Sequence, residues 1–232
     1  MVALALVSGG MLGACGSSPV TRASVEQATS TSTSPPAAST TTTRPVFSGV
    51  VLPVTAGDLP SSWRTGCPVG PEDLRLLRMT HRGFDGQAHA GAMVVHASVT
   101  EEVLEVFRHL YEVGFPIRRM EPVDVYGGSD EASTEADNTS AFNCRKAVAS
   151  GPASWSAHAY GKAIDVNPVE NPYLLGGTVL PPAGAEYLDR SDVRPGMAVP
   201  GGDITAAFAA VGWSWGGTWP APDYQHFSKT GG

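Results

Sequence analysis

The residues best suited to chemistry lie in two short segments of the C-terminal half of the chain. One segment runs from Ser156 to Asp165 and contains His158, and the other runs from Asp223 to His226. A catalytic zinc site takes three protein ligands, for example two imidazoles and one carboxylate, and keeps a fourth position for water. The sequence therefore predicts a site for one Zn2+ ion, with His158, Asp165 and His226 as ligands.

The remaining carboxylate, Asp223, stands three residues before a predicted ligand. Zinc lowers the pKa of its bound water to about 7, so a nucleophile exists at neutral pH. Asp223 is expected to take the water proton as general base and pass it to the departing amine. Ser156 is expected to bond the backbone or a metal ligand, because such contacts orient imidazoles around metals. Tyr160 is expected to shape the substrate cleft.

Two other readings of the same residues deserve comparison. Ser156, His158 and Asp165 resemble a nucleophile triad in type, but no Gly-x-Ser-x-Gly turn surrounds the serine. Two histidines and a carboxylate also form the facial triad of iron(II) oxygenases. That site usually has its first histidine and carboxylate two residues apart, whereas His158 and Asp165 are seven apart. Both alternatives are therefore less favoured than zinc.

The elements before these segments follow simple patterns. Residues 92–97 read as a buried strand, and Thr100 is expected to cap a helix with Glu101 and Glu102 near its positive end. Helical spacing gives this helix one apolar face. The residues of that face are Val103, Val106, Phe107 and Leu110. Gly114 is expected to end the helix.

Later segments include two further strands. Residues 162–167 alternate as a strand does, which turns Asp165 away from the apolar side, and residues 213–215 alternate similarly. A polar loop is expected over 127–140 and a long surface excursion over 174–202, with Asp203 capping a short helix. Because strands and helices do not alternate as βαβ units, the fold class is α+β, with a small antiparallel sheet flanked by helices.

A family resemblance rests on these motifs. The pattern Ser-x-His-x-x-Gly-x-Ala-x-Asp from Ser156, followed by Asp-x-x-His-Phe from Asp223, resembles the zinc D-alanyl-D-alanine carboxypeptidase and L-alanyl-D-glutamate endopeptidase family. Residues 138–145 and 212–217 are also similar to a bacterial branch of it. Four segments in the right order are far more specific than one short motif. The resemblance covers about residues 47–228 and implies the fold shared with the Hedgehog signalling domain and cleavage of peptidoglycan stem peptides.

The resemblance also implies that His158, Asp165 and His226 are zinc ligands and that Asp223 is the general base. Family members usually hold the substrate carbonyl or terminal carboxylate with an arginine some thirty residues before the first ligand. Residues 125–130 contain no arginine here. Arg145 is the nearest guanidinium in a family-like stretch, and it either takes over this role or is structural. The resemblance leaves open whether the enzyme is a carboxypeptidase or an endopeptidase.

The N-terminus has the composition of a targeting segment. Residues 1–15 are apolar and small, and end in a lipoprotein-type processing box at Cys15, the predicted lipidation site. The alternative is a secretory segment with a chance cysteine. Residues 16–46 are rich in Ser, Thr and Pro and cannot bury enough apolar surface to fold, so they are expected to form a tether.

Two cysteines remain, Cys67 and Cys144. An even remainder in an exported protein favours a disulfide between them, and the alternative is two unrelated buried thiols. The absence of Cys-x-x-Cys spacing argues against metal binding by these cysteines.

The rest of the chain, residues 47–232, has the length of one peptidase domain. A net charge of −7 without a basic cluster argues against a nucleic-acid partner. The sequence thus predicts a monomeric zinc peptidase that acts on peptidoglycan peptides. It is expected at the cell envelope, anchored by lipid to the outer face of the cytoplasmic membrane, or else secreted. A non-catalytic cell-wall-binding domain on the same fold is the alternative, but such a domain would not need Asp223.

Overall fold

The structure is a computed structural model that describes residues 46–148 and 153–229. These residues belong to a single compact unit, Arg44–Gly232. The predicted signal segment with Cys15, and the tether apart from its last residue, lie outside the described residues and stay predictions. Among the described residues, none of the helices has the length and apolar character that crossing a membrane demands.

The first half of the domain forms an antiparallel sheet in the order β1-β2-β3, with β1 over Gly49–Pro53, β2 over Leu74–Arg82 and β3 over Ala88–His96. The strand expected at 92–97 is the second half of β3, and β3 pairs with β2 along its whole length. Alternate β2 and β3 residues such as Leu77 and Met93 are fully buried. One face of the sheet therefore packs against the apolar core.

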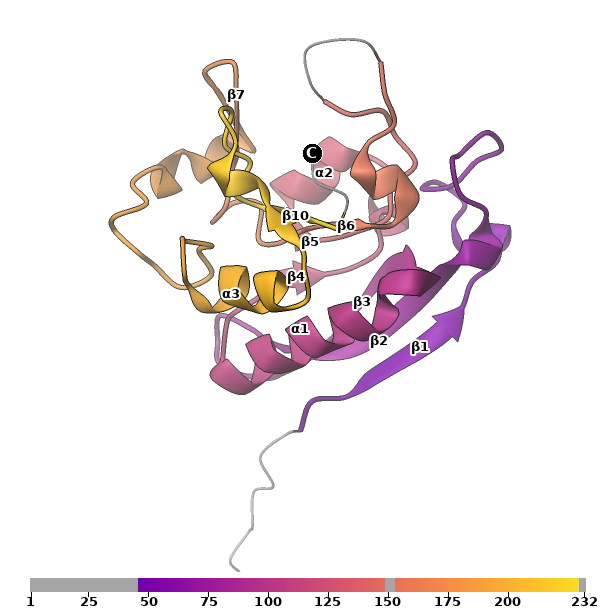
Figure 1. The fold of residues 1–232 in the computed structure, drawn as a ribbon, viewed down its shortest axis with the longest axis horizontal. Coiled ribbons are helices and arrows are strands. Elements are labelled where there is room, and N and C mark those ends of the chain that lie inside the picture. The colour runs from indigo at the N-terminus through magenta and orange to yellow at the C-terminus, as the bar shows by residue number, and fades with distance from the viewer. Residues whose placement is uncertain (1–45, 149–152, 230–232) are drawn as a thin grey trace, which may run out of the picture. The chain divides into compact units, whose positions relative to one another are not determined.

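Helix α1, Thr100–Val113, covers that face of the sheet (Figure 1). Its predicted apolar face is confirmed, because the residues of that face are all buried. The prediction that Thr100 caps the helix is wrong. Val99 holds the cap position, and the Thr100 hydroxyl instead donates to the carbonyl of Ala97 at 3.1 Å. Gly114 ends the helix in the left-handed conformation, as predicted.

A second antiparallel sheet has the order β6-β10-β9. Strand β6 covers Ala163–Asp165, β10 covers His226–Ser228 and β9 covers Ser214–Trp215, so both predicted strands exist but are shorter than expected. The pairing of β6 with β10 joins the two segments that carry the predicted chemistry.

Shorter elements complete the domain. Strand β4, Arg119–Met120, runs parallel to β5, Asn138–Thr139, and helix α2, Asp130–Glu135, lies within the stretch expected to be a plain loop. The predicted excursion contains the hairpin of β7, Tyr173–Leu175, and β8, Thr178–Leu180. Helix α3 covers Asp203–Ala210, with Gly202 rather than Asp203 at its cap. Short 3-10 helices cover Ala56–Asp58, Pro71–Asp73, Ala97–Val99, Val123–Tyr126, Ala157–Tyr160, Pro182–Tyr187 and Gly216–Thr218.

One apolar core joins both sheets through the helices. The Phe208 ring of α3 stacks on Phe227 of β10 with centroids 4.2 Å apart and meets Phe107 of α1 edge-on at 6.5 Å. Figure 1 shows α3 between α1 and β10, in agreement with these contacts. Small antiparallel sheets packed with a few helices confirm the α+β fold class. The core anchors β10 at the residue next to His226, which fixes the position of that imidazole.

Candidate metal centre

His158 lies in the 3-10 helix Ala157–Tyr160 and is held by its local sequence. The hydroxyl oxygen of Ser156 caps this helix by accepting a hydrogen bond from the His158 backbone N–H at 3.3 Å. Gly161 ends the helix with a φ of 64°, which favours glycine. The His158 Nδ1 lies 2.6 Å from the carbonyl oxygen of Ala141, which can only accept. Nδ1 therefore carries the proton, and Nε2 presents its lone pair.

Asp165 and His226 meet that nitrogen from the paired strands β6 and β10. His158 Nε2 lies 3.1 Å from Asp165 Oδ2, and His226 Nδ1 lies 3.1 Å from Asp165 Oδ1. The two imidazole nitrogens are 3.2 Å apart. One donor atom from each residue falls within 4.8 Å of the others, and all three residues are buried. The structure thus brings together the three predicted ligands from distant parts of the sequence.

The donor set fits a divalent cation. Burial works against the charged form of Asp165, but the two imidazoles outweigh it and hold the pKa of this carboxyl well below its usual range. The site therefore offers an ionised carboxylate and one nitrogen from each imidazole to one buried point. Two imidazoles with a carboxylate are a ligand set that zinc accepts. His158, Asp165 and His226 can hold such an ion.

Asp223 is placed beside the cluster by backbone contacts. Its N–H donates to the Gly216 carbonyl at 3.1 Å, and its own carbonyl accepts from the His226 N–H at 3.3 Å. The buried Oδ1 atom has no hydrogen-bond partner among the described residues. Burial raises the pKa of Asp223 to about 7, with the Asp165 charge adding to the effect and His226 and Arg145 opposing it. The carboxyl is therefore suited to proton transfer near neutral pH.

The cluster opens into a cleft of about 1240 Å³. All three candidate ligands and Asp223 border it, as do Ser156 and Tyr160. Its other walls come mainly from α2, from residues 145–148 and 154–157, from the β7–β8 hairpin and from residues 219–221. The Trp219 ring lies in this wall with its centroid 5.2 Å from that of His226. A peptide bound in the cleft can therefore reach the cluster.

Arg145 also borders this cleft, but it is already engaged. Its Nε lies 2.7 Å from Oδ1 of Asp130 at the start of α2, and its Nη1 donates to the Lys146 carbonyl at 3.3 Å. Sequence analysis missed Asp130 because the partner lies fifteen residues away on a helix that was not expected. The guanidinium thus lines the cleft with its charge largely compensated.

A disulfide joins Cys67 to Cys144, directly before Arg145. The Cys144 carbonyl also accepts a hydrogen bond from Arg64 Nη1 at 2.6 Å. Cys144 belongs to a second, smaller apolar cluster with Leu74, Val94 and Phe142, and the partly buried Cys67 packs against that cluster. The pairing favoured by cysteine number therefore exists in the structure, and it fastens the segment that supplies Arg145.

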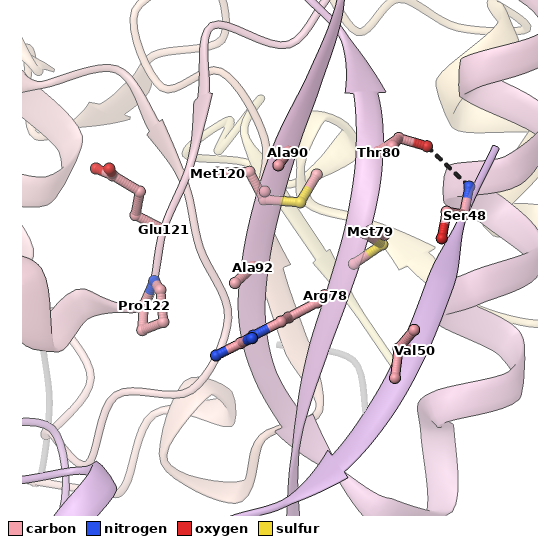
Figure 2. Close-up of a pocket in the computed structure, with 11 residues that line it drawn as sticks. Ser48, Val50, Arg78, Met79, Thr80, Ala90, Ala92, Met120, Glu121 and Pro122 are labelled. Atoms are coloured by element: carbon pink, nitrogen blue, oxygen red, sulfur yellow. Dashed lines mark hydrogen bonds between the residues drawn. The ribbon is translucent and has the colours of Figure 1, made fainter. Parts of the chain in front are cut away.

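A separate groove of about 470 Å³ lies along the β1-β2-β3 sheet (Figure 2). Thr80 and Arg78 of β2, Ala90 and Ala92 of β3 and Met120 of β4 line it, and it shares no lining residue with the metal cleft. Its lining residues include no imidazole and a single carboxylate. This groove therefore lacks a constellation for catalysis.

The fold and the site together define an α+β domain with a buried His-Asp-His centre and a neighbouring carboxylate, the layout of a metal-dependent hydrolase. Residues 150–229, about a third of the chain, match the family model described as D-alanyl-D-alanine carboxypeptidase. This match confirms the resemblance that the two motifs carry and supports a peptidoglycan-related metallopeptidase in general. No curated protein and no solved structure matches the chain.

Proposed function

We propose that this protein is a zinc peptidase that hydrolyses the stem peptides of peptidoglycan with an activated water molecule. The observation that carries the proposal is the convergence of His158, Asp165 and His226 within 4.8 Å, next to the acid Asp223. A binding domain without catalysis would have no use at this place for a carboxyl group whose pKa is raised to about 7 and whose Oδ1 atom has no hydrogen-bond partner among the described residues.

The proposed mechanism assigns a role to each residue. When bound, zinc supplies a Lewis acid that lowers the pKa of water and withdraws charge from a carbonyl oxygen. Asp223 accepts the proton of the attacking water at its carboxylate and delivers it to the amine that leaves. The hydrogen bond from His158 Nδ1 to the Ala141 carbonyl keeps the opposite nitrogen free for the metal.

The cleft supports a peptide of several residues as substrate. Its volume of about 1240 Å³ exceeds the usual range of small-molecule sites. Tyr160 and Trp219 add aromatic surface to its walls, and both backbone and side chains of a peptide can pack there. Both the carboxypeptidase and the endopeptidase reaction on stem peptides are compatible with this space.

Digestion of purified peptidoglycan fragments tests the proposal directly. Mass spectrometry of the products should show a peptide bond cleaved by the zinc-loaded protein, and cleavage should stop with a chelator and return with zinc. Release of a single terminal D-alanine would identify a carboxypeptidase, and internal cleavage an endopeptidase. Intact fragments with zinc-loaded protein would contradict the proposal. Activity that needs iron(II) and a 2-oxoacid would instead favour an oxygenase.

We also propose that the enzyme works outside the cytoplasmic membrane, held by a lipid on Cys15. The composition of residues 1–46 supports this location. A lipoprotein-type processing box ends at Cys15, and the Ser-, Thr- and Pro-rich segment that follows has too few apolar residues to fold and can serve as a tether. Mass spectrometry of the N-terminal peptide from cells should find an acylated Cys15. A Cys15→Ser variant should no longer be found in the membrane fraction. An unchanged distribution between the membrane and soluble fractions would contradict the lipid anchor.

A further inference from the structure

We propose that His81 and Met120 form a second metal site, which takes the soft monovalent cation copper(I). This site lies on the β1-β2-β3 sheet and shares no residue with the candidate metal centre, so it is independent of the proposed peptidase activity. A buried imidazole nitrogen without a partner and a thioether sulfur border the same small gap there.

His81 of β2 is a buried histidine whose Nδ1 atom has no hydrogen-bond partner among the described residues. The residue is only 5% exposed, and its ring stacks on that of His89 with centroids 5.7 Å apart. Burial lowers the pKa of His81 to about 4, with His89 adding to the effect and Asp85 opposing it, so the ring is neutral at pH 7. A neutral imidazole has a lone pair on one nitrogen. A bound ion would give the buried Nδ1 the partner that such atoms normally have.

Gly91 of β3 leaves a gap beside this nitrogen. A methyl group at position 91 would lie 2.7 Å from Cβ and 2.8 Å from Sδ of Met120, and 2.9 Å from His81 Nδ1. These three atoms are its nearest neighbours. The sulfur and the nitrogen therefore border one point that no side chain of residue 91 fills.

The strand register adds a second sulfur to this face of the sheet. Met79 of β2 stands directly opposite Gly91, and its side chain lies on the same face as that of His81. Met79, Gly91 and Met120 all border the groove of about 470 Å³. Figure 2 shows the Met120 side chain at this groove, with its sulfur directed toward the strand that carries Met79. An ion can therefore reach the gap from the groove, and Met79 can supply a further thioether.

These donors select a soft cation of low charge. Thioether sulfur suits copper(I), and imidazole is also a copper ligand. The imidazole and the thioethers are neutral, so a divalent ion buried among them would keep its full charge uncompensated, which is costly. The candidate zinc centre differs in this respect, because it offers the ionised carboxylate of Asp165. The two sites are therefore expected to sort zinc and copper(I) between them.

The test measures copper(I) binding to the full chain with zinc already bound, so that the other centre is occupied. Anaerobic titration against a chromogenic copper(I) chelator gives the stoichiometry and the affinity, and zinc analysis of the same samples detects displacement. His81→Phe keeps a flat ring without nitrogen, and Met120→Leu keeps the apolar volume. Met197→Leu is the control, because the Met197 sulfur already accepts a hydrogen bond from the Arg194 N–H at 3.1 Å and does not border the groove. Thermal unfolding shows that each variant is folded.

The wild type should bind one copper(I) ion per chain and keep its zinc. His81→Phe and Met120→Leu should each weaken copper binding at least about tenfold, whereas Met197→Leu should bind as the wild type does. X-ray absorption at the copper edge should show both sulfur and nitrogen neighbours. Unchanged affinity in either His81→Phe or Met120→Leu, or copper uptake with an equal release of zinc, would overturn this site.

Discussion

Asp165 and His226 stand directly opposite each other on β6 and β10, with Asp165 Oδ1 and His226 Nδ1 3.1 Å apart. The pairing register of two short strands therefore sets the distance between two of the candidate ligands. A slip by one residue would turn either side chain to the other face of the sheet. The stacked rings of Phe208 and Phe227 oppose such a slip, because Phe227 follows His226 and fills the core.

Replacement of Asp223 by Asn should separate metal binding from catalysis. The amide keeps the size of the side chain but cannot accept the water proton, so the hydrolysis rate should fall at least about a hundredfold. Zinc content should stay near one ion per chain, because Asp223 is not among the three candidate ligands. Measured turnover of a stem peptide, with metal analysis of the same sample, decides the matter. Full activity in this variant would refute the assigned base.

Gly216→Ala should impair the enzyme by moving Asp223. A methyl group at position 216 would lie 2.7 Å from the backbone oxygen of Asp223, which must then shift. Because a displacement of about 1 Å can cost a hundredfold in rate, turnover should drop about ten- to a hundredfold. Gly57→Ala is the matched control, since its methyl group meets only an ordinary contact at 3.6 Å. Equal turnover in the two variants would contradict this role for Gly216.

Removal of the disulfide should destabilise the domain. Cys67 and Cys144 are 77 residues apart, and a link over that distance contributes about 4–5 kcal/mol in the chain-entropy model. Cys67→Ser with Cys144→Ser should lower the unfolding free energy by an amount of this order, measured by urea denaturation. Reductant should lower the stability of the wild type but leave the variant unchanged. Similar stabilities of the wild type and the variant without reductant would exclude a structural disulfide.

Glu170 should make the stability of the domain depend on pH. It is almost completely buried near Asp137 and Arg118, and burial, reinforced by the Asp137 carboxyl, raises its pKa to about 8. The ordinary pKa of a glutamate is about 4.3 in an unfolded chain. Between these two values the folded state holds a proton that unfolding releases, so stability falls as pH rises, by at most about 1.4 kcal/mol per unit.

Glu170→Gln should remove this contribution, because the amide does not titrate. Urea denaturation of wild type and variant from pH 5 to pH 9 provides the measurement, and the stability difference between them isolates Glu170 from other groups. The wild type should lose stability relative to the variant up to about pH 8 and run parallel to it above that pH. Parallel curves over the whole range would show that Glu170 ionises normally.

Sequence patterns selected the two segments that the structure brings together, but described their surroundings less well. His158, Asp165 and His226 could be selected because residue type and spacing are local properties of the sequence, and the structure places them within 4.8 Å of one another. Their role as zinc ligands stays a prediction. The ion pair between Asp130 and Arg145 was not, because it depends on where α2 packs. Helix α2 itself is short and polar, and its residues fit a loop equally well. The N-caps of α1 and α3 were misplaced by one residue, because a polar side chain at the first helical position resembles a cap.

The central claim is that His158, Asp165 and His226 bind one zinc ion. A crystal structure of the zinc-loaded protein, with anomalous diffraction measured on both sides of the zinc edge, tests it most directly. We expect a single strong anomalous peak about 2.0–2.2 Å from His158 Nε2, His226 Nδ1 and an Asp165 carboxylate oxygen. A zinc peak on other residues, or none in the presence of excess zinc, would contradict the claim.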